Sequence, residues 1–167
     1  SYADNGTYTV ALTITDDDGL TDTTSQNITV LNRPPIASFT ESATSVPTGT
    51  VIYFNASAAY DPDGYIVSYF WDFGDGTNDT GVTTEHAYAD DGTYMVTLNI
   101  TDDDGATAIA KATKIILNRP PIASFTENAT TVYIDEVIYF NASASYDPDG
   151  YIFTISGISA TEPTPQA

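Results

Sequence analysis

The chain has no cysteine and only four basic residues among its 167 residues. Without cysteine there are no disulfides and no thiolate metal sites, so a secreted origin has to be argued from other features. The 23 acidic residues give a formal net charge of -19, which would repel the phosphates of nucleic acid. We therefore expect no nucleic-acid partner, whereas cations or a salty medium suit such a surface.

Long apolar runs and helical periods are missing too. The longest apolar candidate, residues 106–117, is interrupted by two lysines, so we expect no membrane span. The single histidine, His86, cannot be assembled with a nucleophile and an orienting acid into a catalytic set. Asp72 and Asp75 lie in a tight turn instead of a cleft, which disfavours a glycosidase-type carboxylate pair. The sequence predicts a protein that is not an enzyme.

What the sequence does contain is a long repeat. Residues 2–19 recur as 88–105, an offset of 86 residues, with 14 of 18 positions identical. A fixed period of this length indicates serial copies of one folding unit. The repeat predicts a complete unit at 32–117, the C-terminal half of a unit at 1–31, and the N-terminal half of another at 118–152. Residues 153–167 leave the pattern and form a divergent tail, for which we predict a substitute strand through Ile152, Phe153, Ile155 and Ile158.

Short segments of alternating apolar and polar residues predict strands. The alternation is strong in 93–101 and in its counterpart 7–15. Further strands are expected at 51–58 and at 66–73, where Trp71, the only tryptophan, is our expected core anchor. Acidic turns containing glycine separate these segments, so the fold class is an all-β sandwich.

Finer expectations concern which side chains face inward. The residues of 51–58 predicted to face the core are Ile52, Phe54, Ala56 and Ala58. The strand after the turn at 102–105 alternates poorly, and its Lys111 and Lys114 indicate an exposed edge. In the partial units, strands are expected at 20–31, 122–126 and 136–144.

A set of motifs in a fixed order closely resembles the PKD (polycystic kidney disease) domain. The motifs are Asn32-Arg-Pro-Pro-Ile-Ala, Tyr60-Asp-Pro-Asp-Gly-Tyr-Ile, Tyr69-Phe-Trp-Asp-Phe-Gly-Asp-Gly76, His86-Ala-Tyr, Gly92-Thr-Tyr and Thr101-Asp-Asp-Asp-Gly105. The resemblance implies immunoglobulin-like, PKD-type sandwiches in extracellular or cell-surface proteins, often in tandem and especially in archaea and bacteria. Such modules act as spacers, adhesion elements or surface-layer parts and not as catalysts.

Asparagine is unusually often part of an Asn-X-Ser/Thr sequon. Seven of the nine asparagines are in such sequons: Asn5, Asn27, Asn55, Asn78, Asn99, Asn128 and Asn141. A threonine-rich β protein also produces sequons without any modification, which is the alternative explanation. Several sequons are found in one repeat only, and Asn55, Asn99 and Asn141 are expected on outward faces. We favour N-linked glycans on an exported glycoprotein, with Asn5, in a tight turn, as the least secure site.

The acidic turns also suggest calcium, which takes six to eight oxygen ligands. Some domains that the unit resembles, notably those of bacterial collagenases, bind calcium between the domain start, the Asp-X-Asp-Gly turn and the late acidic turn. Residue by residue, the resemblance implies Asn32, Asp61, Asp63 and Asp102, with Asp104 as an addition. The equivalent set in the partial units is Asn118, Asp147 and Asp149, joined to Asp16 of another chain. Plain turn formation explains the same aspartates equally well.

The half-units suggest how the protein assembles. Half a sandwich leaves an apolar face and strand edges exposed, so the two halves would be stabilised by closing against each other in different chains. Head-to-tail closure of this kind propagates into filaments. The first hypothesis is a structural subunit of a glycosylated extracellular filament that polymerises with itself through a split domain.

Two alternatives remain open. The first is a fragment of a longer tandem-repeat cell-surface protein, an adhesin or a surface-layer stalk. A continuing array should repeat Trp-Asp-Phe-Gly-Asp-Gly after Ile152, and the sequence does not. The more distant alternative is an accessory carbohydrate-binding module of a secreted hydrolase, for which Tyr53, Tyr65 and Tyr151 would offer aromatic contacts.

Overall fold

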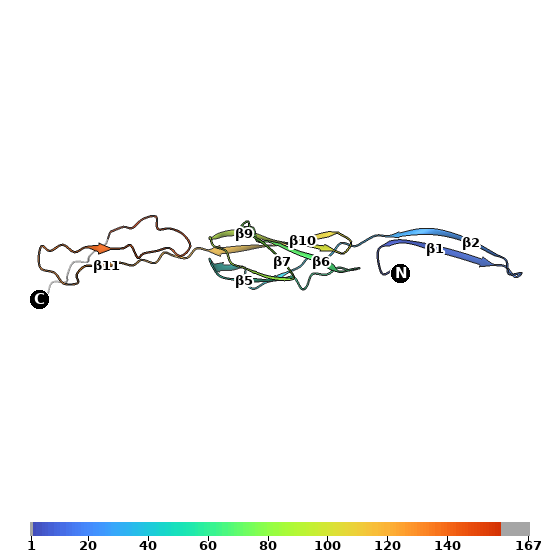
Figure 1. The fold of residues 1–167 in the computed structure, drawn as a ribbon, viewed down its shortest axis with the longest axis horizontal. Coiled ribbons are helices and arrows are strands. Elements are labelled where there is room, and N and C mark those ends of the chain that lie inside the picture. The colour runs from blue at the N-terminus through green and yellow to red at the C-terminus, as the bar shows by residue number, and fades with distance from the viewer. Residues whose placement is uncertain (1, 158–167) are drawn as a thin grey trace.

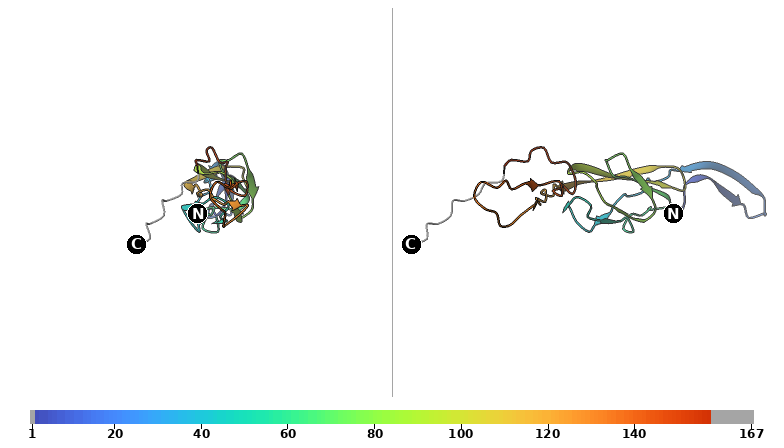
Figure 2. Two further views of the ribbon diagram at one scale, coloured as in Figure 1. Left: turned by 90° about the vertical axis from the view of Figure 1, so that its left-hand side faces the viewer. Right: turned by 60° about the vertical axis from the view of Figure 1, so that its left-hand side comes forward.

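The computed structural model describes residues 2–157, which form strands and loops arranged as three segments along one long axis (Figure 1). The view along that axis superimposes the three segments, so each follows the previous one end to end (Figure 2). Among the described residues no helix has the length and apolar character needed to cross a membrane.

The first segment is a two-stranded hairpin. β1 (Gly6–Thr15) and β2 (Thr21–Val30) pair antiparallel along their whole length, from Gly6 opposite Val30 to Thr15 opposite Thr21. The alternation predicted for 7–15 and the strand predicted at 20–31 are therefore both present as strands. No second sheet covers the hairpin in the described part of the chain, and most of its apolar residues are exposed, with Tyr8 and Val30 half-buried.

The central segment is a sandwich of two sheets. The larger sheet has the order β4 (Ser45–Pro47), β10 (Thr107–Leu117), β9 (Gly92–Asp102), β6 (Ile66–Asp72) and β7 (Asn78–Thr80). The smaller sheet has the order β3 (Thr40–Glu41), β5 (Ile52–Asn55) and β8 (Thr83–His86). Within these sheets only β4 runs parallel to its partner, β10. The predicted all-β, immunoglobulin-like sandwich is confirmed.

The core lies between these sheets around Trp71, as expected. Its side chain is completely buried, and the indole Nε1 donates a 2.9 Å hydrogen bond to the carbonyl oxygen of Gly81. The rings of Phe39 and Phe54 have centroids 5.1 and 5.7 Å from that of Trp71, in edge-on and tilted arrangements typical of aromatic packing. β9 contributes Val96, Leu98 and Ile100, all completely buried.

Two predictions about side-chain direction are wrong. The side chain of Lys114 is not exposed, although it lies in the part of β10 that has a free edge: it is completely buried, because β10 directs its even-numbered residues inward and Lys114 follows Ala110 and Ala112 on that face. Ala58 is exposed and Ala59 is buried, because β5 ends at Asn55 and a turn shifts the alternation. Lys111, by contrast, is exposed as predicted.

The third segment has few regular hydrogen bonds. β11 (Thr126–Glu127) pairs with β12 (Phe140–Asn141), which is much less than the strands predicted at 122–126 and 136–144. An isolated bridge between Ile122 and Tyr146 repeats the bridge between Ile36 and Tyr60 in the complete unit. Residues 153–157 form no strand, and the rest of the predicted tail lies outside the described residues.

A hydrogen-bonded contact joins the second and third segments. The Thr48 hydroxyl, in the turn after β4, donates a 2.5 Å hydrogen bond to Asp149 Oδ2. The backbone N–H of Arg119, in the connection between the segments, donates to the same oxygen at 2.8 Å. One aspartate of the third segment is therefore bound both to the connection and to the preceding sandwich.

Candidate functional site

The end of the sandwich that faces the first segment brings together three parts of the chain. Asn32 begins the unit, and its Nδ2 donates a 2.9 Å hydrogen bond to Asp102 Oδ2, at the end of β9. The next N–H, of Arg33, donates to Asp63 Oδ2 at 3.0 Å. The domain start, the Asp-X-Asp-Gly turn and the late acidic turn thus meet at one end, as an immunoglobulin-like topology requires.

Two carboxylate oxygens at this end lack partners. Asp61 Oδ2 and Asp63 Oδ1 are shielded from solvent and accept no hydrogen bond from the described residues. Desolvation raises the pKa of Asp61 above its ordinary value, and the charges of Asp63 and Asp102 raise it further. The turn therefore concentrates negative charge that the protein itself does not neutralise.

Asp102 is stabilised differently from Asp61. Desolvation acts to raise its pKa, but hydrogen bonds from the Asn32 amide and from the backbone N–H groups of Ala106 and Asp104 outweigh it and lower the pKa. The Ala106 N–H lies 2.7 Å from Asp102 Oδ1. Asp102 is buried and charged because Asn32 and its own turn supply these donors.

A fourth acidic side chain at this end is Asp103, which the sequence prediction missed. Its Oδ1 accepts a 3.0 Å hydrogen bond from the Tyr65 N–H, and its carboxylate lies against Gly64. Asp104, the predicted addition, contributes its backbone N–H to Asp102. Turn composition alone does not fix which of three consecutive aspartates faces the neighbouring loop, so no signal in the sequence distinguishes them.

The side-chain oxygens at this end of the sandwich are of the chemical type that binds calcium. Carboxylates and a side-chain amide are hard oxygen ligands, and the two shielded, unpartnered oxygens of Asp61 and Asp63 are the type of atom that a cation would satisfy. Among residues 2–157 no three acidic or histidine side chains are already grouped as a metal site. The calcium assignment to Asn32, Asp61, Asp63 and Asp102 remains a prediction.

The predicted shared site lies at two separate places within one chain. Asp16 is at the tip of the hairpin, where its Oδ1 accepts hydrogen bonds from Asp18 and Leu20 N–H groups. The turn of Asp147 and Asp149 belongs to the third segment, beyond the connection that begins at Asn118, and contacts the sandwich through the Thr48 hydroxyl. Hydrogen bonding to the Thr48 hydroxyl is the largest cause of the lowered pKa of Asp149.

Four of the seven sequon asparagines have a structural role in the described fold. Asn55 and Asn141 accept hydrogen bonds from the N–H two residues later, at 2.8 and 2.9 Å, and so close small turns. Asn128 Oδ1 accepts from the Tyr139 N–H at 2.7 Å, and Asn27 Oδ1 from the Thr9 hydroxyl at 2.8 Å. All four side chains belong to exposed or half-buried residues, so these bonds explain the asparagines without excluding a glycan.

The other three sequons differ in setting. Asn5 is half-buried in the turn before β1, Asn78 is exposed at the start of the edge strand β7, and Asn99 is in the middle of β9, in the centre of the larger sheet. Asn99 Oδ1 is shielded and accepts no hydrogen bond from the described residues. The predicted outward direction of Asn99 agrees with the burial of its neighbours Leu98 and Ile100 in the core.

His86 has contacts typical of a structural residue. Its ring stacks on Phe73, with centroids 4.2 Å apart and planes 7° apart, and packs edge-on against Tyr88. Its Nε2 lies 2.7 Å from Asp75 Oδ2 and 3.5 Å from the Thr77 hydroxyl. Since both neighbours meet the same ring nitrogen, the three residues do not form a relay from acid through histidine to nucleophile.

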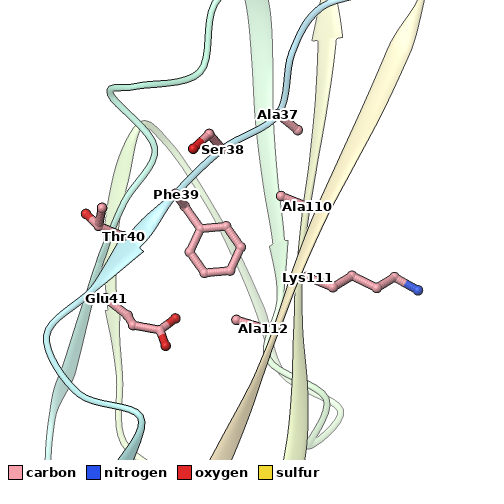
Figure 3. A pocket seen from close by; sticks show the side chains of 8 residues that line it. All are labelled: Ala37, Ser38, Phe39, Thr40, Glu41, Ala110, Lys111 and Ala112. Atoms are coloured by element: carbon pink, nitrogen blue, oxygen red, sulfur yellow. The ribbon is translucent and has the colours of Figure 1, made fainter.

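A shallow groove runs along the side of the sandwich between β3 and β10 (Figure 3). Phe39 points into it, Ala110 and Ala112 form its small floor, and Lys111 projects away from it. Before residue 115, β10 pairs with β9 alone, so this side of β10 is a free strand edge. The exposed Lys111 suits such an edge, because charged side chains discourage pairing with other strands.

Comparisons with known proteins agree with this architecture. A family described as the PKD domain matches residues 32–116. A microbial collagenase of Vibrio alginolyticus is 40% identical over 91 residues, which cover 54% of this chain and 11% of the collagenase. The human dyslexia-associated protein KIAA0319 is 30% identical over 180 residues, covering 97% of this chain and 17% of that protein.

Among solved structures, a study of carbohydrate-binding modules from the β-sandwich superfamily provides a chain with 28% identity and a TM-score of 0.50. The match covers 62% of this chain and 51% of that chain. The described chain spans only 11% and 17% of the lengths of the two curated relatives above, so it corresponds to a small part of each.

Proposed function

Because the chain belongs to the PKD domain family, we propose that it is a non-catalytic spacer in an extracellular or cell-surface protein, built from PKD units in series. Relatives named as collagenases carry the same module, which supports an exported setting. The end-to-end arrangement of the three segments supports a spacer, because it adds length with little width (Figure 1).

One observation carries the proposal: equivalent side chains are buried in the complete unit and exposed in the partial one. Val96, Leu98 and Ile100 are 0% exposed, whereas their repeat counterparts Val10, Leu12 and Ile14 are 48%, 61% and 60% exposed. An apolar face of this kind is stable only when another sheet covers it. This exposed face supports the proposal that the hairpin is part of the larger sheet of a further sandwich, completed by other polypeptide.

The test is to extend the chain upstream by the residues that complete the first unit. Small-angle scattering should then show a rod of similar length whose first segment has the cross-section of the central sandwich. Protection of β1 and β2 amides from hydrogen exchange should rise to the level of β9 and β10. An extended chain whose β1 and β2 amides exchange as fast as before would refute the proposal.

A second candidate is the self-assembling filament, favoured by the complementary character of the two partial units. The hairpin supplies the equivalents of β9 and β10, and the third segment those of β3 and β5. One pairing counts against closure between identical chains. Glu127 matches Glu41, whose partner is Lys114, but the hairpin has Ile28 at the lysine position. Closure would leave Glu127 without a cation.

Electron microscopy and sedimentation of the purified chain separate the two candidates. The spacer proposal expects dispersed particles, with or without calcium. A fibre that repeats about every two domain lengths would favour the filament instead. An Ile28→Lys variant provides a matched control, because it supplies the missing cation and should strengthen any closure between chains.

We also propose calcium as a stabilising ligand at the Asn32, Asp61, Asp63 and Asp102 end. A bound cation would neutralise the repulsion among the three carboxylates and join the domain start to both acidic turns. An accessory carbohydrate-binding role is supported by the structural relative alone. Glycan-array binding by the purified chain would test that role.

A further inference from the structure

We propose that Asn99 carries an N-linked carbohydrate whose first sugar packs on Phe70 and Ile109, on the outer face of the five-stranded sheet. The inference goes beyond the spacer role and rests on one part of it, the extracellular setting. It assigns to one sequon a local purpose that the other six do not share.

The three residues are direct neighbours across three strands. Phe70 of β6 and Ile109 of β10 are each paired with Asn99 of β9, one on either side. Paired residues of antiparallel strands point to the same face, with Cβ atoms about 4.5–5.5 Å apart. Since Leu98 and Ile100 fill the core, the row of Phe70, Asn99 and Ile109 faces solvent.

This row is apolar at both ends. Phe70 is 44% exposed and Ile109 is 58% exposed, so each keeps a large hydrophobic surface in water. A pyranose ring has one face of C–H groups and a rim of hydroxyls. Its C–H face suits contact with an aromatic ring and an aliphatic side chain, while its hydroxyls stay hydrated. A sugar linked to the residue between the two would cover both.

The side-chain amide of Asn99 has no evident structural task. Its Oδ1 is shielded and accepts no hydrogen bond from the described residues, which costs free energy in a folded protein. Asn55 and Asn141 differ, because their amides close turns. The unpartnered amide of Asn99 costs the fold free energy, and the sequon through Thr101 gives a reason for an asparagine at this position.

The repeat provides an internal comparison. The hairpin residues equivalent to Asn99 and Ile109 are Thr13 and Thr23, whose hydroxyls are 2.9 Å apart and hydrogen-bonded. That unit therefore has a self-satisfied polar pair where the complete unit has a sequon beside an apolar residue. Both positions differ together, as expected if the apolar neighbour serves the sugar.

The test uses the full chain secreted from a yeast that attaches N-glycans. Glycopeptide mass spectrometry should find Asn99 occupied. Asn99→Gln should then lower the midpoint of thermal unfolding by about 4 °C, the shift expected for one modest packing contact in a domain of this size. The matched control is Asn78→Gln, whose cross-strand neighbour is Asp72 and not an apolar residue. Loss of a glycan there should leave the midpoint unchanged.

A second pair of variants tests the packing itself. With Phe70→Ala in place, Asn99→Gln should change the midpoint clearly less, because only the contact of the sugar with Ile109 remains. The double variant Asn99→Thr with Ile109→Thr recreates the pair found in the hairpin and should fold normally without a glycan. An unmodified Asn99 beside an occupied Asn78 would overturn the proposal, and so would a midpoint that falls equally with and without Phe70. Yeast attaches the glycan whatever the role of the chain in its own host. The occupancy of Asn99 and the unfolding midpoints therefore test this proposal independently of the spacer role.

Discussion

The ammonium group of Lys114 is completely buried, and its partner is the carboxylate of Glu41 on the opposite sheet. Lys114 extends from β10 across the space between the sheets, and Glu41 receives it from β3. The side chain of Glu41 is 20% exposed, and among the described residues it is the one acidic group within ion-pair distance of the lysine. A buried ion pair of this type is sensitive to the loss of either member.

Replacing Glu41 with Gln should lower the free energy of unfolding by about 3 kcal/mol, because it leaves a buried ammonium without a counter-charge. Urea denaturation followed through Trp71 fluorescence measures the change. Glu41→Leu combined with Lys114→Ile should restore most of the stability, since a packed apolar pair often replaces a buried ion pair without loss. A double variant as unstable as Glu41→Gln would contradict this account.

The position of Lys114 shows what the sequence could and could not predict. Period-two alternation is strong in β9 and β1, because large apolar residues occupy each inward position. In β10 the inward positions include Ala108, Ala110 and Ala112, so the pattern is weak and the direction of Lys114 cannot be read from it. Strands and fold class follow from alternation, but a buried charge follows only from the partner that the opposite sheet provides.

The residues at the Asn32, Asp61, Asp63 and Asp102 end of the sandwich could also be predicted only in part. The order of strands places Asn32 near Asp102, and the resemblance to PKD domains names the turn of Asp61 and Asp63. The contribution of Asp103 depends on how the loop 102–105 packs against Gly64 and Tyr65, which is a tertiary contact. Likewise, spacing identifies a sequon, but only the fold distinguishes an amide that closes a turn from one that faces apolar neighbours.

Gly74 should tolerate no side chain. It has φ +81°, and a Cβ would lie 2.7 Å from the Met95 carbonyl oxygen, so Gly74→Ala adds a backbone clash to conformational strain. We expect a loss of about 3 kcal/mol, against about 1 kcal/mol for Gly105→Ala. Gly105 is the control, because it has φ +87° and open space around it. Equal losses on chemical denaturation would show that the contact with Met95 is unimportant.

Leu98 and Leu12 hold equivalent positions in the repeat, so the same substitution compares a covered sheet with an uncovered one. Leu98→Ala should cost about 3 kcal/mol, because the residue is in the closed core. Leu12→Ala should leave the unfolding of the sandwich unchanged in this chain. Once upstream residues complete the first unit, Leu12→Ala should destabilise that unit as Leu98→Ala does here. Calorimetry of both chains provides the measurement.

Asp75 should make the sandwich acid-sensitive. Desolvation acts to raise its pKa, but hydrogen bonds from Thr77 and the pairing with His86 lower it below the ordinary value of 3.8. A carboxyl group whose pKa is lower in the folded than in the unfolded protein stabilises the fold at pH values above its unfolded pKa. This stabilisation disappears as the pH falls through its folded pKa. Asp75→Asn should therefore be less stable than the parent at pH 7, and the difference should vanish in acid. A difference that persists at the lowest pH would have to come from lost hydrogen bonds alone.

The Asp61 carboxyl group should change stability with pH in the opposite direction to Asp75. Its pKa is raised, so ionisation is less favourable in the folded state, and stability from this group increases as the pH falls from neutrality towards 3.8. Asp61→Asn keeps an oxygen for the hydrogen bond from the Asp63 N–H and removes one of the three repelling charges. The variant should thus have a higher unfolding midpoint than the parent in chelator-treated buffer.

In millimolar calcium the order of the two midpoints should reverse, because the parent gains a calcium-bound state that the variant loses. Scanning calorimetry with calcium and with magnesium separates a specific site from general screening of the acidic surface. If calcium raises both midpoints equally, this turn is not where the ion binds.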